Sequence, residues 1–128
     1  MKISHIAIWV NDLEQMTSFY CRFFNGRAGA IYRNPAKGFE SCFVSFDSGA
    51  SIELMRKTDR LLPVAGDDIY AGFHHLAFSV GSSGEVDRLT EIIRNAGFMV
   101  KGNSRTTGDG YYESVILDPE GNTVEITV

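Results

Sequence analysis

HIAIWV at residues 5–10 is matched 70 residues later by HLAFSV at residues 75–80. Both copies alternate between apolar and other residues, which is typical of a strand that buries one face. Ile6, Ile8 and Val10 form the apolar face of the first copy, and the histidine that opens each copy lies on the other face. Self-similarity of this kind indicates two equivalent modules in one chain.

A helix-start signal follows each of these strands. An N-cap residue is followed by Gln or Glu three positions later, and the two pairs are Asp12 with Gln15 and Ser82 with Glu85. Apolar residues then recur at helical spacing in both copies. We expect each helix to end at a glycine in the left-handed conformation, Gly26 in the first copy and Gly97 in the second.

Three further strand-like runs follow each helix, separated by residues that favour turns. The runs are residues 28–33, 41–46 and 51–56 in the first copy, and 98–103, 111–117 and 123–127 in the second. This order predicts an α+β fold of two βαβββ modules, residues 1–58 and 73–128, joined by a linker at residues 59–72. We expect one domain, residues 1–128, with a curved mixed sheet around a concave site.

The composition is that of an ordinary globular protein, with 44% hydrophobic and 22% charged residues among 128 and a formal net charge of −4. Acidic and basic residues are interspersed, so nucleic acid is not an expected partner. No apolar run is long enough for a bilayer, and no signal peptide pattern is visible. Cys21 and Cys42 lack the spacing of a disulfide framework, which predicts reduced thiols in a cytoplasmic protein.

Two glutamates complete the pattern that the two histidines begin. Glu53 lies in the run 51–56 on the face opposite its apolar residues, and Glu125 has the equivalent place in the last run. The histidine-to-glutamate separation is 48 residues in one module and 50 in the other. Imidazole nitrogen and carboxylate oxygen suit divalent ions such as Zn²⁺, Ni²⁺, Co²⁺, Mn²⁺ or Fe²⁺. The predicted ligands of one such ion are His5, Glu53, His75 and Glu125.

Four segments carry a resemblance to a known family: HIAIWVNDLEQMTSFY, SIELM, HLAFSV and the closing DPEGNTVEI. They resemble the vicinal oxygen chelate superfamily of glyoxalases, bleomycin resistance proteins and extradiol dioxygenases, and are close to small bacterial lactoylglutathione lyase-like proteins. The resemblance implies a metal-dependent lyase or isomerase with one divalent ion per site, which chelates vicinal oxygens of a small substrate. It also implies a homodimer and a glutamate that shuttles a proton, a role open to both Glu53 and Glu125.

Two positions depart from bacterial glyoxalase I, which has an arginine at the position of Trp9 and an aromatic-Asn pair where this chain has Met55-Arg56-Lys57. Those family positions bind glutathione, so their replacement argues against a glutathione adduct as substrate. We expect a pocket for another small oxygen-bearing compound. Its predicted lining residues are Trp9, Phe46, Met55, Arg105, Tyr111 and Glu113.

Other functions of the same superfamily remain open. The resemblance also allows a ring-cleaving dioxygenase, an epimerase or a fosfomycin-type thiol transferase, and a fourth ligand at Glu53 argues against each. A non-catalytic protein that sequesters a drug, as in bleomycin resistance, is the alternative of a different class. His74 competes with His75 as a ligand, but the repeat aligns His75 with His5 and places His74 on the apolar side of the strand.

Overall fold

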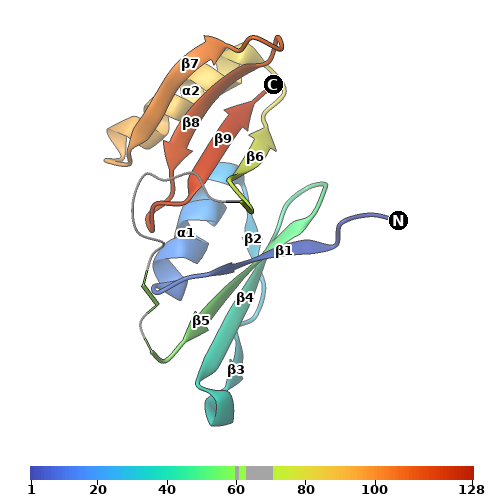
Figure 1. Cartoon of the computed structure of the whole chain (residues 1–128), viewed down its shortest axis with the longest axis vertical. Helices are drawn as coiled ribbons and strands as arrows, with labels where there is room; N and C mark the ends of the chain where they lie inside the picture. Colours follow the sequence, from blue (N-terminus) through green and yellow to red (C-terminus); the bar gives the residue numbers. More distant parts are fainter. Residues whose placement is uncertain (60, 63–70) are drawn as a thin grey trace. The chain divides into compact units, whose positions relative to one another are not determined.

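The computed structural model describes residues 1–59, 61–62 and 71–128, and its contacts divide the chain into two units, Met1–Tyr70 and Ala71–Val128. In the described part of each unit a helix packs on a sheet (Figure 1). The α+β class and the two-module organisation predicted from the sequence are confirmed. Most of the predicted linker at 59–72 lies outside the described residues.

The described residues of unit 1 form one α-helix, a short 3-10 turn and a five-stranded sheet. Its elements are β1 (His5–Trp9), α1 (Leu13–Phe24), β2 (Arg27–Ala28), β3 (Tyr32–Asn34), η1 (Pro35–Lys37), β4 (Phe39–Ser45) and β5 (Ser51–Lys57). The strand order is β1-β5-β4-β2, and β3 also pairs with β4. β1 and β5 are parallel and β4 is antiparallel to β5, so the sheet is mixed as predicted.

The strand predicted at residues 28–33 is interrupted. Ala28 pairs with Val44 of β4, whereas Tyr32 pairs with Ser41. The chain advances four residues from Ala28 to Tyr32, whereas their partners on β4 are only three residues apart. The extra residue disrupts the ladder locally, as in a β-bulge, and separates β2 from β3.

Helix α1 begins as predicted but ends differently. The side chain of Asp12 accepts a hydrogen bond from the backbone N–H of Gln15 at 2.9 Å. At the other end Asn25, with φ of 54°, takes the left-handed conformation predicted for Gly26. Gly26 is instead suited to close packing, because an added Cβ would lie 2.5 Å from Cγ1 of Val44.

Unit 2 repeats the topology of unit 1. Its elements are β6 (His75–Ser79), α2 (Ser83–Asn95), β7 (Val100–Thr106), β8 (Tyr112–Leu117) and β9 (Thr123–Thr127), in the sheet order β6-β9-β8-β7. Ser82 caps α2 and Gly97 has a positive φ of 89°, both as predicted. β7 begins two residues later than predicted and continues to Thr106, where it pairs with β8.

The core of each unit lies between its helix and the apolar face of its sheet. Ile52 and Leu54 of β5, and Val124 and Ile126 of β9, are buried, and the helices contact these strands. The glutamates between them point to the opposite face, which the strand alternation predicts. No helix among the described residues has the length and apolar character needed to cross a membrane.

Candidate metal centre

The first predicted pair of ligands lies on two neighbouring parallel strands of unit 1. In the β1–β5 register His5 is opposite Ser51, and Ala7 is opposite Glu53. The Nε2 atom of His5 is 3.8 Å from the Oε2 atom of Glu53. Phe43 packs edge-on against the His5 ring, with centroids 5.2 Å apart, and restricts its movement.

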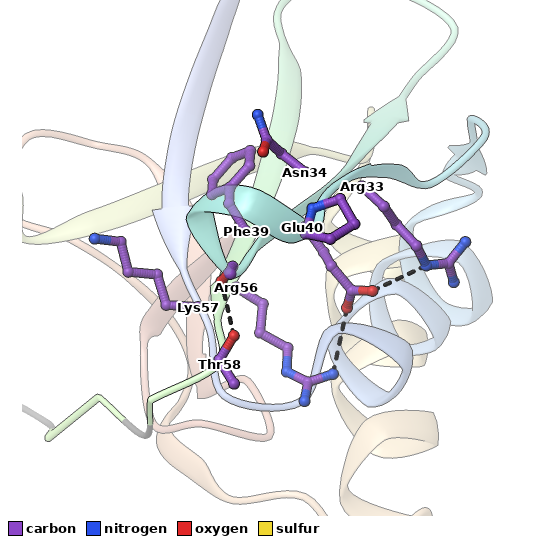
Figure 2. A pocket seen from close by; sticks show the side chains of 9 residues that line it. Arg33, Asn34, Phe39, Glu40, Arg56, Lys57 and Thr58 are labelled. Carbon is purple, nitrogen blue, oxygen red and sulfur yellow. Dashed lines mark hydrogen bonds and ion pairs between the residues drawn. The ribbon is translucent and has the colours of Figure 1, made fainter.

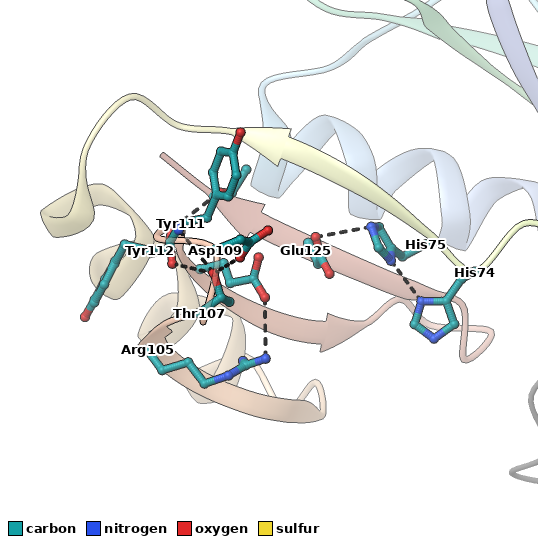
Figure 3. Close-up of polar contacts among 10 residues, drawn as sticks. His74, His75, Arg105, Thr107, Asp109, Tyr111, Tyr112 and Glu125 are labelled. Carbon is teal, nitrogen blue, oxygen red and sulfur yellow. Dashed lines mark hydrogen bonds and ion pairs between the residues drawn. The ribbon is translucent and has the colours of Figure 1, made fainter.

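The second predicted pair has the equivalent arrangement in unit 2, shown in Figure 3. Ala77 of β6 is opposite Glu125 of β9. The Nε2 atom of His75 is 3.2 Å from the Oε2 atom of Glu125. His74 lies on the other edge of the same ring, with its Nδ1 atom 2.9 Å from Nδ1 of His75. His75, rather than His74, therefore faces the glutamate.

The distances within each pair can be compared with those between two ligands of one ion. Bonds of about 2.0–2.2 Å to nitrogen and oxygen place two ligand atoms about 2.9 Å apart at a right angle and about 3.4 Å apart at a tetrahedral angle. The 3.2 Å between His75 and Glu125 falls inside this interval. The 3.8 Å between His5 and Glu53 is slightly longer than this interval. The spacing of His75 and Glu125 therefore matches that of two ligands of one ion, and the spacing of His5 and Glu53 lies just outside it.

The glutamates are more shielded from solvent than the histidines. The exposed fraction of the side chain is 17% for Glu53 and 19% for Glu125, against 43% for His5 and 34% for His75. Partial burial lowers the effective dielectric constant around a carboxylate, so its attraction for a nearby cation is stronger than in open water.

The structure brings the predicted ligands together as two separate His–Glu pairs. Among the described residues, no three His, Cys, Asp or Glu side chains form a group that could hold a metal ion. The first pair belongs to unit 1 and the second to unit 2. The convergence of all four side chains on one ion therefore stays a prediction.

Two of the predicted pocket residues share the face of unit 1 that carries Glu53. Trp9 is opposite Met55 in the β1–β5 register. Trp9 is 47% exposed, and Phe39 packs edge-on against its ring at 6.1 Å between centroids. The ammonium of Lys57 lies 5.8 Å from the centre of the Trp9 ring. Trp9 therefore forms an aromatic wall with the Lys57 ammonium over its ring.

Phe46 has a different environment from Trp9 and Met55. Its ring lies next to Gly26 at the end of α1, where an added Cβ would be 3.3 Å from Cε1 of Phe46. Phe43 is the β4 aromatic that is opposite Glu53 in the strand register. Phe43 is not among the predicted pocket residues, although the alternation of β4 already places it on the face of Glu53.

The predicted pocket residues of unit 2 gather around the β7–β8 hairpin. Arg105 is opposite Glu113, and the Nη2 and Oε1 atoms of this ion pair are 3.4 Å apart. The exposed Tyr111 closes the hairpin, because Thr107 N–H donates to its carbonyl at 2.8 Å. The loop at residues 106–110 thus has the hydrogen bonding of a turn.

Tyr111 and Tyr112 point to opposite sides, as Figure 3 shows. The hydroxyl of Tyr112 donates a hydrogen bond at 2.9 Å to Asp87 of α2. This bond, with smaller contributions from desolvation and from the Asp87 charge, raises the pKa of Tyr112 above its usual range. Tyr112 therefore ties the sheet to the helix, whereas Tyr111 lies on the side of Glu113.

An open pocket of about 370 Å³, not predicted from the sequence, lies at the C-terminal end of β5. Figure 2 shows Glu40 accepting hydrogen bonds from Arg33 at 2.9 Å and Arg56 at 3.4 Å. Lys57, the next residue along β5, points to the other side. Arg33 and Arg56 therefore converge on the Glu40 carboxylate, and Lys57 does not join them.

The comparisons with solved structures identify the fold. Glyoxalase I from Zea mays matches with a TM-score of 0.78 and 21% identity over 98% of this chain, which spans only 44% of the maize chain. A glyoxalase family protein from Enterococcus faecalis matches with a TM-score of 0.82 and 20% identity, over 99% of this chain and 97% of that one. The trypanothione-dependent glyoxalase I of Leishmania major matches with a TM-score of 0.74 and 18% identity, over 99% and 86% of the two chains.

No curated protein matches the sequence. A family model does match, and it covers residues 2–126. Both predicted ligand pairs and every predicted pocket residue lie within that match. The chain belongs to the Glyoxalase/Bleomycin resistance protein/Dioxygenase superfamily.

Proposed function

We propose that the chain is a metal-dependent lyase or isomerase of the glyoxalase I type. One divalent ion per site is held by His5, Glu53, His75 and Glu125. The observation that carries this proposal is the repetition of a His–Glu pair at equivalent strand positions of both units, with Nε2–Oε2 distances of 3.8 and 3.2 Å. A glutamate that merely faces solvent has no reason to recur beside a histidine in both copies.

The bound ion supplies a Lewis acid that polarises vicinal oxygens of the substrate. The chain supplies the proton transfer. Glu53 and Glu125 are the two candidate bases, since each combines a carboxylate near the ion with a partly shielded environment suited to moving a proton between adjacent carbons. His5 and His75 keep the ion in place while one carboxylate acts on the substrate.

The residues around Trp9 indicate which class of substrate the chain binds. Trp9 and Lys57 stand where glutathione-binding residues stand in bacterial glyoxalase I, and Lys57 places its ammonium over the indole ring. We therefore propose a small oxygen-bearing substrate other than a glutathione adduct. Met55, Arg105, Tyr111 and Glu113 are proposed to contribute to its pocket.

The ligand assignment is tested by metal titration of chelator-treated protein. Wild type is expected to bind one Zn²⁺ or Ni²⁺ per site, and Glu53→Gln and Glu125→Gln are each expected to weaken binding. Glu91→Gln is the matched control, because Glu91 is exposed on α2 and pairs with Arg94. Wild-type affinity in both ligand variants would refute the metal site.

Activity is tested by elemental analysis of the purified protein, followed by a substrate screen of the metal-loaded form. The screen includes the methylglyoxal–glutathione hemithioacetal, for which turnover is expected to be poor. Rapid turnover of this adduct would contradict the inference from Trp9 and Lys57. A protein that binds no metal but retains a small organic ligand would favour the drug-sequestering alternative.

We also propose a cytoplasmic homodimer. A βαβββ module is too small to close a deep site alone, so two modules must pair, either within one chain or between two chains. Light scattering at micromolar concentration is expected to give twice the mass of the chain. A monomer under those conditions contradicts the dimer.

A further inference from the structure

The residue before each candidate histidine ligand contacts the Nδ1 edge of its ring. In unit 1 the hydroxyl of Ser4 lies 3.4 Å from Nδ1 of His5. In unit 2 Nδ1 of His74 lies 2.9 Å from Nδ1 of His75. The same sequence position therefore supplies a partner to the same ring atom in both modules.

This arrangement leaves the Nε2 edge of both rings free to face the glutamate. An imidazole that binds a metal through Nε2 carries its proton on Nδ1, and a partner for that N–H fixes both the tautomer and the ring orientation. Nδ1 of His74 is an acceptor for such a proton when its own ring is protonated on Nε2. The two Nδ1 atoms approach each other to 2.9 Å, with the rings at 82° to one another, so His74 contacts the Nδ1 edge of the His75 ring.

The two modules differ in how closely this partner approaches. His74 is at hydrogen-bonding distance, 2.9 Å, and its module has the shorter Nε2–Oε2 separation, 3.2 Å. Ser4 is farther away, at 3.4 Å, and its module has the longer separation, 3.8 Å. The module with the shorter contact at Nδ1 thus also has the shorter distance between the histidine Nε2 and the glutamate Oε2.

We propose that His74 is a positioning residue for His75. It accepts the Nδ1–H of His75 and aims Nε2 at the metal position beside Glu125, and Ser4 is its weaker counterpart beside His5. His74 is then neither an alternative ligand nor an incidental exposed residue. This inference rests on the proposed metal site.

The test compares Zn²⁺ affinity among variants by competition with a chelator. His74→Ala is expected to weaken binding about 10- to 100-fold, the usual cost of losing a partner of a ligating histidine. His74→Asn is expected to recover much of the affinity, because its amide oxygen takes the place of the acceptor Nδ1. Ser4→Ala is expected to cost less than His74→Ala. His75→Ala should cost more than any of them.

A second readout follows the ring proton directly. In Zn²⁺-loaded wild type, nitrogen NMR is expected to show His75 protonated on Nδ1, with slow exchange of that proton with solvent. His74→Ala should accelerate this exchange, whereas His74→Asn should keep it slow. His74 is exposed, so the variants are expected to unfold at the wild-type temperature.

The outcomes separate this inference from the proposed function. If wild type binds Zn²⁺ and His75→Ala weakens it, but His74→Ala leaves affinity and exchange unchanged, the positioning role is overturned and the metal site stands. If His74→Ala costs more affinity than His75→Ala, His74 is itself the ligand and the positioning role is overturned. If wild type binds no metal, both fall.

Discussion

Ala7 lies opposite Glu53 in the parallel ladder between β1 and β5, and Ala77 lies opposite Glu125 in the equivalent ladder of unit 2. Residues opposite each other in a ladder share a face of the sheet. On the side of β1 and of β6, the side chain beside each glutamate is therefore a single methyl group. This leaves the carboxylate room to turn toward an ion or a substrate.

Enlarging these alanines should impair the metal site without unfolding the protein. Ala7→Val and Ala77→Val are each expected to lower metal affinity roughly tenfold, the lower end of what changes around metal ligands cost. Stability should change little, because β-branched residues suit strands. Titration calorimetry measures the affinity. Ala28→Val, on the exposed strand β2, is the control and should bind metal like wild type.

Asp118 organises the turn that leads into β9. Only 4% of this residue is exposed, and its carboxylate accepts hydrogen bonds from the backbone N–H of Glu120 at 3.0 Å and of Asn122 at 2.9 Å. It also accepts one from the Asn122 side chain at 2.8 Å. Asp118→Ala is expected to lower the free energy of unfolding by about 2–3 kcal/mol, since it leaves partly buried donors unpaired.

Urea unfolding measures this loss, and Asp47→Ala provides the comparison. Asp47 forms an ion pair with Arg27 at 2.7 Å, but its side chain is exposed. Surface ion pairs contribute about 0–1 kcal/mol, so the Asp47 variant should stay close to wild type. Equal losses in the two variants would contradict the structural role of Asp118.

Gly26 should not tolerate a side chain, for a reason unrelated to backbone conformation. An added Cβ would lie 2.5 Å from Cγ1 of Val44 and 3.0 Å from the carbonyl oxygen of Tyr20. Gly26→Ala is expected to cost about 1–3 kcal/mol of unfolding free energy through overpacking. Gly84→Ala is the matched control, because nothing lies within 4 Å of its added Cβ. It lies in α2, so it should be neutral or stabilising by up to about 1 kcal/mol.

Much of the fold could be predicted because its signals are local. The caps at Asp12 and Ser82 and the alternation around Glu53 each depend on residues a few positions apart. The left-handed residue at Asn25 was missed because Gly26 is the better local candidate. The constraint on Gly26 comes from Val44, which is distant in sequence and enters only through packing.

The candidate site was predictable for the same reason, but only in part. The pairing of His5 with Glu53 follows from the strand period and the repeat. The contact between His74 and His75 depends on the direction of a side chain just before a strand, which the strand pattern does not determine. The pocket around Glu40 is built from three separate segments, and no local pattern brings Arg33 to Arg56.

Alkaline pH should weaken the contact between β8 and α2. The hydrogen bond from Tyr112 to Asp87 favours the neutral phenol in the folded state and raises its pKa above the unfolded value. A raised pKa means that the stabilisation is fully present below about pH 10, the ordinary pKa of tyrosine, and is lost as the pH rises through the folded-state value.

Thermal unfolding at about pH 9 and about pH 11 is expected to show a smaller decrease in Tm for Tyr112→Phe than for wild type. Tyr111→Phe is the comparison, because the Tyr111 side chain is exposed, and it should retain the wild-type decrease. An identical decrease in Tm for wild type and both variants would show that the Tyr112–Asp87 bond does not contribute.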